Sequence, residues 1–321
     1  MSWISPNLTE PSLDLRQLVL QRVAAVRHGR QAALQGPPRP SLLLQGGHHP
    51  NLRIEWYEDL FADIKARYPI HLHALSPSEI LHIAHFSRIS LDETLRRLRD
   101  AGHDSLPGGG AEILVDRVRD LIAPKKTKSA EWLGVMRDAH RLGVSSTATM
   151  MYGHVETLEE RVEHMRRVRE LQDETRGFRA FISWTFQHEH TDMPDVPETF
   201  AEEYLRTLAV SRLFLDNIVH FQTSWVTQGK KIGQVALSFG ADDMGSIMIE
   251  ENVVSAAGTR YKMSQEEMER LIASAGYTPR QRTNLYERIV EPGETAELAR
   301  RYRHALTAEN RALASPLPVL G

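Results

Sequence analysis

The stretch VSSTATMMYGHVETLEERVEHMRRVRELQDETRGFRAFISWTFQ, residues 144–187, decides the fold of this chain. Ser146–Tyr152 is short, apolar and rich in β-branched residues, as strands are. A threonine followed by two glutamates then indicates a helix start, and apolar residues recur every three or four positions until a glycine. Phe178–Phe186 is a second apolar run of strand length. This order predicts a parallel sheet with a right-handed crossover.

Parallel sheets of alternating strands and helices place their chemistry at the carboxyl ends of the strands. In this stretch those ends carry Tyr152-Gly153-His154-Val155-Glu156 and Trp184-Thr185-Phe186-Gln187-His188. We therefore expect the functional site where these two segments meet.

Several segments resemble one enzyme family. They are TATMMYGHVET (147–157), LQDETRGF (171–178), FISWTFQ (181–187), GADDMGSIMIEENVVSAAG (240–258) and YTPRQR (277–282). Their wording resembles that of the radical S-adenosylmethionine enzymes of the futalosine route to menaquinone, above all the cyclic dehypoxanthine futalosine synthases. Deazaflavin-precursor synthases and aminofutalosine synthase share the GHxET core but not the wording around it. The resemblance runs from Ser41 to about Tyr286.

The resemblance implies a (β/α)8 TIM-type barrel. We predict strands near 42–46, 70–75, 103–106, 146–152, 178–186, 217–224 and 237–242. Residues 1–40 do not resemble the family, and we expect them to form a helix over 13–28 and a proline- and glycine-rich linker. The first barrel strand and the cluster-binding loop are then absent or replaced, and the barrel is open beside its second strand. The expected organisation is 1–40, a barrel over 41–290, and a C-terminal helix and tail over 291–321.

Composition excludes several classes of protein. The 321 residues are 41% hydrophobic, which is enough for one large α/β core. The formal net charge of -3 gives no electrostatic footprint for nucleic acid, and no apolar run is long enough to cross a bilayer. We expect a cytoplasmic protein whose partners are small molecules.

The chain contains no cysteine. The resemblance implies S-adenosylmethionine and a [4Fe–4S] cluster as cofactors, and three closely spaced thiolates normally hold that cluster. Because no residue matches the CxxxCxxC motif, we do not expect the cluster on this chain.

The resemblance also implies where S-adenosylmethionine lies. A glycine pair after the first resembling strand faces its amino-acid end, a glycine-rich turn before Glu112 closes over the pocket, and backbone near Gly153 contacts adenine. From the residues alone, the glycine pair would be interpreted as a tight turn between a strand and a loop. The expected cofactor-binding residues are Gln45, Gly46, Gly47, Glu112, Met151, Gly153, His154 and Glu156.

On the substrate side, two histidines alternate with apolar residues and therefore face the same side of their strand. Position 242 carries Asp where the family usually has Asn, and a carboxylate only accepts hydrogen bonds. From the residues alone, the acidic run from Asp242 to Glu251 would be interpreted as a solvated loop. The expected substrate residues are His71, His73, Ser224, Trp225, Gln228, Asp242, Asp243, Glu250 and Glu251.

Three functions remain open. The first is the family activity, cyclisation of dehypoxanthine futalosine after reductive cleavage of S-adenosylmethionine, which also needs an electron donor. The second is a non-catalytic remnant or ligand-binding paralogue, which the lack of cysteine favours for this chain. The third is a metal hydrolase built on His71 and His73, which would need carboxylate and histidine partners on later strands. We expect no such metal site.

Overall fold

The computed structural model describes residues 41–45, 47–68, 70–189, 191–247 and 261–286, and the backbone of 289 and 290. Its main sheet has six strands in the order in which they occur in the chain, and all of its pairings are parallel. The strands are β1 (Ser41–Leu44), β2 (His71–Ala74), β3 (Ser105–Leu106), β4 (Ser145–Tyr152), β5 (Phe178–Thr185) and β6 (His220–Gln222).

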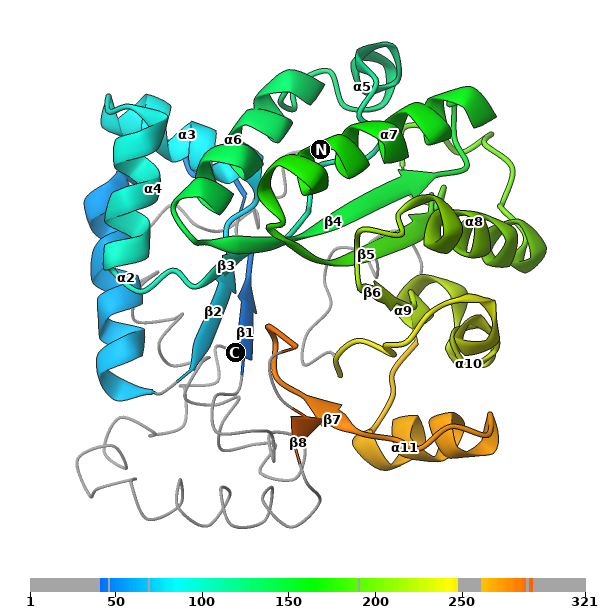
Figure 1. Ribbon diagram of the computed structural model, residues 1–321. Helices are drawn as coiled ribbons and strands as arrows, with labels where there is room; N and C mark the ends of the chain where they lie inside the picture. The colour runs from blue at the N-terminus through cyan, green and yellow to red at the C-terminus, as the bar shows by residue number, and fades with distance from the viewer. Residues whose placement is uncertain are drawn as a thin grey trace, which may run out of the picture.

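Helices follow the strands and cover the outer side of the sheet (Figure 1). They are α2 (Ile54–Arg67), α3 (Pro77–Ser87), α4 (Leu91–Asp100), α5 (Asp116–Ile122), α6 (Ser129–Arg141), α7 (Leu158–Thr175), α8 (Ala201–Phe214), α9 (Trp225–Gln228), α10 (Lys230–Ala236) and α11 (Gln265–Ser274). This alternation around a curved parallel sheet confirms the predicted α/β barrel class.

The predicted strand, helix and strand are β4, α7 and β5. At the start of α7, the Thr157 side chain accepts a hydrogen bond from the Glu160 N–H, while the Glu160 carboxylate accepts one from the Thr157 N–H. The helix ends at Arg176, which has a φ of 53°. Gly177 is needed for a different reason, because a Cβ there would lie 2.1 Å from Cγ of His140.

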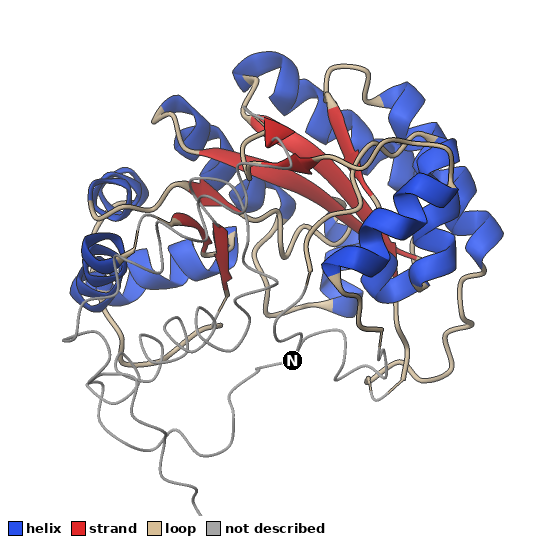
Figure 2. Ribbon diagram, turned by 90° about the horizontal axis from the view of Figure 1, so that it is seen from below, coloured by secondary structure: helices blue, strands red, loops and turns tan. Residues whose placement is uncertain are grey.

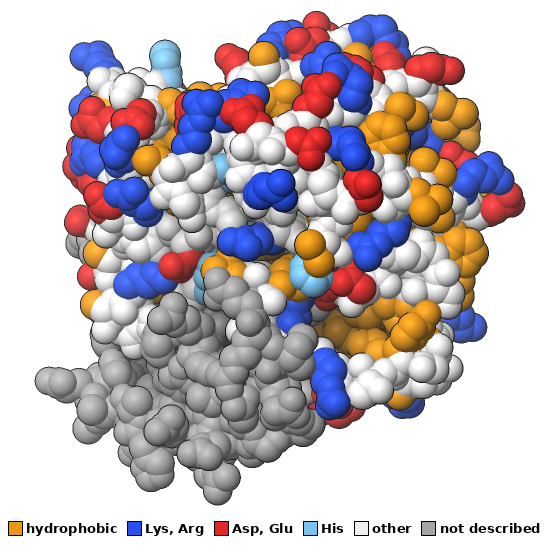
Figure 3. Space-filling model, in the orientation of Figure 1, with side chains coloured by type: hydrophobic (Ala, Val, Ile, Leu, Met, Phe, Trp, Pro, Cys, Tyr) orange, Lys and Arg blue, Asp and Glu red, His pale blue; other side chains and the backbone are white. Residues whose placement is uncertain are grey.

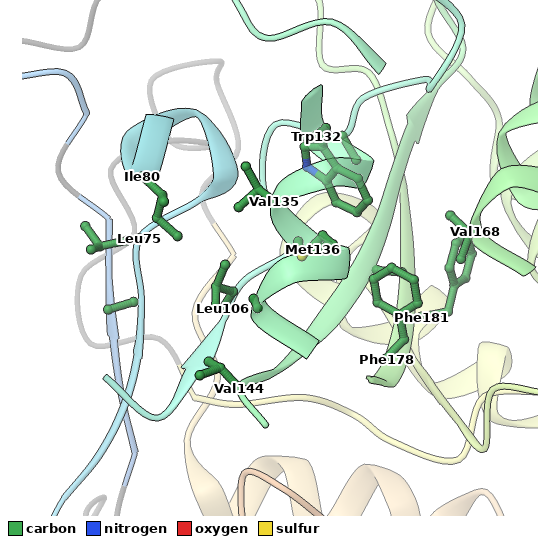
Figure 4. Close-up of a cluster of buried hydrophobic side chains, with 14 of the residues drawn as sticks. Leu75, Ile80, Leu106, Trp132, Val135, Met136, Val144, Val168, Phe178 and Phe181 are labelled. Atoms are coloured by element: carbon green, nitrogen blue, oxygen red, sulfur yellow. The ribbon is translucent and has the colours of Figure 1, made fainter. Parts of the chain in front are cut away.

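The hydrophobic core lies between the sheet and its helices. Outward-facing residues of β4, such as Ala148 and Met150, are fully buried, whereas the inward-facing Met151 is half-buried. Trp132 of α6 stacks on Phe178 of β5 with ring centroids 6.2 Å apart. Figure 4 shows this part of the core. Burying each such side chain contributes about 1.5–3 kcal/mol, so the outer face holds the sheet together and leaves the inner face for function.

Two strand predictions at the end of the barrel need correction. The segment 237–242 is not a strand, because Leu237–Phe239 continues α10 as a 3-10 helix, η1, and Gly240 ends it with a φ of 107°. Among the described residues, an isolated parallel bridge between Gln222 and Asp243 marks the position of the expected last strand. The predicted strand 217–224 is shortened to β6, because α9 begins directly after Ser224.

A second, antiparallel sheet was not predicted. Its two strands, β7 (Gln281–Arg282) and β8 (Ile289–Val290), lie on the side of the molecule toward which the main sheet is open (Figures 1 and 2). In the described part of the chain, β1 and β6 are the outer strands of the main sheet. The expected N-terminal helix and linker and the C-terminal tail lie outside the described residues.

The outer surface carries charges of both signs. In Figure 3 basic and acidic side chains alternate over the helices, and many of them pair, as Arg137 of α6 does with Glu174 of α7 at 2.9 Å. Among the described residues no helix is long and apolar enough to span a membrane.

Candidate functional site

Because the six strands are parallel, the segments that follow them meet at one edge of the sheet, which we call the carboxyl edge. Four of these segments concern the cofactor side: the loop after β1, the start of α3, the glycine turn after β3 and the loop after β4. The loops after β5 and β6 complete the edge on the substrate side.

The loop after β4 is organised around the carboxylate of Glu156. Its Oε1 accepts hydrogen bonds from the Gly153 N–H at 2.6 Å and from Nε of Arg161 at 2.8 Å. Its Oε2 accepts from the His154 N–H and lies 2.9 Å from Nδ1 of the same histidine. Burial opposes ionisation, but the contacts with His154 and the Gly153 N–H lower the pKa of Glu156 to about 2. Glu156 is therefore a buried brace of the loop, and a ligand would meet the loop backbone.

Gly153 and His154 fit this arrangement. Gly153 has a φ of 90°, and a Cβ there would lie 2.0 Å from Oγ1 of Thr199, so no other residue fits. The His154 side chain is fully buried, and its Nε2 lies 3.1 Å from the carbonyl oxygen of Met151. Both residues shape the loop.

The glycine turn after β3 is fastened to β4. The Gly108 N–H donates to Oγ1 of Thr147 at 2.9 Å, and the Thr149 hydroxyl donates to the Gly108 carbonyl at 2.5 Å. A Cβ at Gly108 would lie 2.7 Å from the Thr147 carbonyl oxygen. The turn can therefore lie this close to β4 only with glycine at position 108.

Glu112 ends this turn and is nearly buried, with a φ of 46°. Its carbonyl accepts from the Met151 N–H at 3.0 Å, and its Oε1 accepts from Nζ of Lys126 at 2.5 Å. Burial opposes ionisation, but the charge and hydrogen bond of Lys126, together with the charges of Arg119 and His154, lower the pKa of Glu112. The sequence analysis had no signal for this role of Lys126, which lies 14 residues away in a short basic run.

The loop after β1 is tied to the start of α3. The Gly47 N–H donates to Oε1 of Glu79 at 3.1 Å, while the N–H and hydroxyl of Ser76 donate to Oε2 of the same carboxylate. Nε2 of Gln45 lies 2.6 Å from where a Cβ of Gly109 would be, so Gln45 lies against the glycine turn. The structure thus brings together Gln45, Gly47, Glu112, Met151, Gly153, His154 and Glu156, and Gly46 lies outside the described residues.

The predicted shared face of His71 and His73 is confirmed. Nε2 of His71 and Nδ1 of His73 each lie 2.7 Å from the hydroxyl oxygen of Ser105 on β3. Burial, then the neighbouring charges of His71 and His103, lower the pKa of His73 to about 3. In the described part of the chain, no three His, Cys, Asp or Glu residues are placed to hold a metal ion.

The substrate-side residues after β6 divide into two groups. The Ser224 hydroxyl lies 2.8 Å from Oγ1 of Thr227, and Nε2 of Gln228 donates to Oγ1 of Thr185 at 2.6 Å, at the end of β5. These two lie at the carboxyl edge. Trp225, 1% exposed, instead packs in a small apolar cluster with Met244 and Met263, so its ring does not reach the edge.

Asp242 and Asp243 lie beside β6. Oδ1 and Oδ2 of Asp242 lie 2.7 Å from the Phe221 N–H and from Nδ1 of His220, so both oxygens accept hydrogen bonds from this chain. Asp243 accepts from Nε of Arg282 at 2.9 Å and from the Tyr286 hydroxyl. Both carboxylates are occupied by their neighbours. Glu250 and Glu251 lie outside the described residues.

Inward-facing residues of β4 and β5 line the sheet below the carboxyl edge. Met151 pairs with Trp184 in the strand register, and Thr149 pairs with Ile182. Paired residues of neighbouring parallel strands point to the same side, so Met151 and the half-buried Trp184 lie side by side. The sequence analysis placed Trp184 near this edge without giving it a role.

The comparisons with known proteins agree with this geometry. Residues 26–168 match the Radical SAM superfamily, and residues 175–294 match the CofH/MqnC C-terminal region. Among solved structures, the hydrogenase maturase HydG from Carboxydothermus hydrogenoformans superposes with a TM-score of 0.58 over 91% of this chain and 67% of that one. Methylornithine synthase (PylB) gives 0.53 over 84% and 74%. Both are 13% identical to this chain and show the fold alone. The fold and the edge thus define a protein of the radical S-adenosylmethionine class.

Curated relatives narrow the class to one family. A cyclic dehypoxanthine futalosine synthase from Halalkalibacterium halodurans is 48% identical over 80% of this chain and 70% of its own length. Another from Streptomyces coelicolor is 48% identical over 78% of this chain. Aminodeoxyfutalosine synthase from Thermus thermophilus is 40% identical over 79% of this chain and 70% of its own length. The chain belongs to the CofH/MqnC family, together with the cyclic dehypoxanthine futalosine synthases. It spans 63% of the length of the Streptomyces relative.

The residues present do not fit the iron–sulfur cluster of this superfamily. Thiolates hold such clusters, and this chain has no cysteine. The described residues at the carboxyl edge include Gly47 and Gly153, which the sequence analysis expects beside S-adenosylmethionine.

Proposed function

We propose that this chain binds S-adenosylmethionine and a nucleoside substrate of the dehypoxanthine futalosine type at the carboxyl edge. One observation carries the proposal. The Glu156-braced loop and the glycine turn are joined through the hydrogen bond from the Met151 N–H to the Glu112 carbonyl, so two segments far apart in the sequence form one continuous rim.

The expected residues that lie at the edge or on the inner face have different places in the proposal. Gly47 and Gly153 present backbone to the cofactor, and Met151 offers an apolar contact, whereas Glu112, His154 and Glu156 act through the loops that they hold. On the substrate side, Ser224 and Gln228 lie at the edge, and His71 and His73 lie on the inner face.

We further propose that these 321 residues do not by themselves cleave S-adenosylmethionine, since they contain no cysteine for a thiolate-bound cluster. The chain would then act as a ligand-binding member of its family. The alternative is the cyclase activity itself. That activity needs an electron donor, and it also needs thiolate ligands for the cluster, which this sequence does not contain. The division at residues 40 and 290 and a cytoplasmic location, with no nucleic-acid or membrane partner, remain part of the proposal.

Calorimetric titration of S-adenosylmethionine into the purified chain tests the binding. We expect saturable binding that Met151→Trp abolishes, because the larger ring fills the inner face beside Trp184. Val162→Trp is the control, because Val162 is 43% exposed on the outer face of α7. A dissociation constant on the order of 1 mM is the weakest binding that the proposal allows. If the unmodified chain shows no binding at about 1 mM ligand, the proposal is contradicted.

A further inference from the structure

The acidic side chains on the cofactor side of the carboxyl edge are occupied by this chain. Glu79 holds Ser76 and the Gly47 N–H, Glu112 holds Lys126, and Glu156 holds Arg161 and two backbone N–H groups. These three carboxylates are therefore engaged within the chain rather than directed at a ligand.

The basic side chains of the edge differ from one another. Arg119 is 1% exposed and donates to the carbonyls of Gly110, Ala111 and Thr127. Arg161 is 13% exposed and is paired with Glu156 and Glu203. The Lys126 side chain is 41% exposed, and within the described residues its one acceptor is Oε1 of Glu112. An ammonium group has three donors, so Lys126 keeps donors for a ligand.

The loop that carries Lys126 is fixed. The Lys126 N–H donates to the Ala123 carbonyl at 2.9 Å, and Nε of Arg119 donates to the Thr127 carbonyl at 2.7 Å. The Ser129 N–H donates to Oδ1 of Asp116 at 2.8 Å. These contacts hold the basic run that contains Lys126 against the glycine turn. A freely solvated loop would not be held in this way.

The charge of Lys126 also acts on His48 in the loop after β1. Partial burial, the charge of His82 and the charge of Lys126 lower the pKa of His48, against an opposing effect of Glu79. Lys126 is thus near enough to His48 for its charge to be felt there. Its ammonium group contacts Glu112 at the end of the glycine turn.

We propose that Lys126 is the anion-binding residue of the ligand site and donates to a carboxylate of the bound ligand. Glu112 is its positioning residue. This inference rests on the proposed function and deepens it, since both the amino-acid end of S-adenosylmethionine and the benzoate of dehypoxanthine futalosine carry a carboxylate.

The test compares ligands with and without that carboxylate. S-adenosylmethionine, its decarboxylated analogue and dehypoxanthine futalosine are each titrated into the unmodified chain, Lys126→Met, Lys126→Arg and Lys125→Met. A charge-assisted hydrogen bond predicts an affinity loss of about 10- to 100-fold in Lys126→Met for one carboxylate ligand and none for the decarboxylated analogue. Lys126→Arg recovers part of the loss. Lys125→Met is the matched control, because Lys125 is exposed and directly precedes Lys126 in the same run.

The ligand that loses affinity identifies the carboxylate. A loss confined to S-adenosylmethionine assigns it to the cofactor, and a loss confined to dehypoxanthine futalosine assigns it to the substrate. Equal losses for S-adenosylmethionine and its decarboxylated analogue, or no loss for any ligand, would overturn the role of Lys126 while leaving the proposed function intact. If the unmodified chain binds none of the three, the proposed function itself is wrong.

Discussion

Replacing Glu156 by Gln tests whether this carboxylate braces the loop after β4. The Glu156 side chain is 1% exposed and accepts from two backbone N–H groups and from Arg161. Gln keeps one acceptor oxygen, places an amide N–H₂ against the remaining donors, and leaves Arg161 without one of its two carboxylates. The pKa of Glu156, lowered from 4.5 to about 2, corresponds to about 3 kcal/mol of stability at pH 7.

The sign of the pH dependence follows from the lowered pKa. The carboxylate stabilises the folded chain fully above pH 4.5, its pKa when unfolded, and loses that effect as the pH falls toward 2. The difference in unfolding free energy between the unmodified chain and Glu156→Gln should therefore shrink by about 1 kcal/mol between roughly pH 5 and pH 3.5.

Urea unfolding at several pH values measures both quantities. Glu170→Gln on α7 is the control, because Glu170 is 60% exposed and solvent screens its pair with the exposed Arg166. A Glu156→Gln variant within about 1 kcal/mol of the unmodified chain at pH 7, or a difference that does not change with pH, would refute the reasoning.

Three further variants test other parts of the account. Gly153→Ala should lower the unfolding free energy by about 2 kcal/mol or more, and Thr199→Ala should restore part of it by removing the clash at 2.0 Å, as thermal unfolding would show. Arg282→Met should cost about 3 kcal/mol because it leaves the 8% exposed carboxylate of Asp243 without a cation, and adding Asp243→Asn should recover part of that loss in urea unfolding. Asp242→Asn should cost only about 1 kcal/mol, since the 42% exposed side chain loses one of two accepted hydrogen bonds, and a cost above roughly 3 kcal/mol would contradict this.

The sequence predicted the parts of the fold that local patterns determine. The alternation in β4 and β5 and the capping box of α7 depend on residues a few positions apart, so their elements could be located in advance. The predicted strand over 237–242 failed because an apolar run of that length also suits the end of a helix, and Gly240 stops the helix after η1.

The sequence indicated which segments lie at the carboxyl edge, but not which groups their side chains contact. Glu156 and Glu112 were expected to touch the cofactor, yet their carboxylates hold Arg161 and Lys126. The contacts of Asp243 with Arg282 and Tyr286 join segments about 40 residues apart. No spacing rule in a single sequence reports such distant pairs, which is why the sequence analysis missed Lys126 and Arg282.

We propose that this chain binds S-adenosylmethionine at the carboxyl edge and, having no cysteine, does not cleave it. The direct measurement is the yield of 5′-deoxyadenosine after anaerobic iron and sulfide treatment, followed by dithionite, S-adenosylmethionine and dehypoxanthine futalosine. We predict none above a preparation free of the chain, and we predict that grafting a family N-terminus with its three cysteines onto Ser41 restores it. Formation of 5′-deoxyadenosine by the cysteine-free chain, in material free of the host's own radical enzymes, would contradict the account.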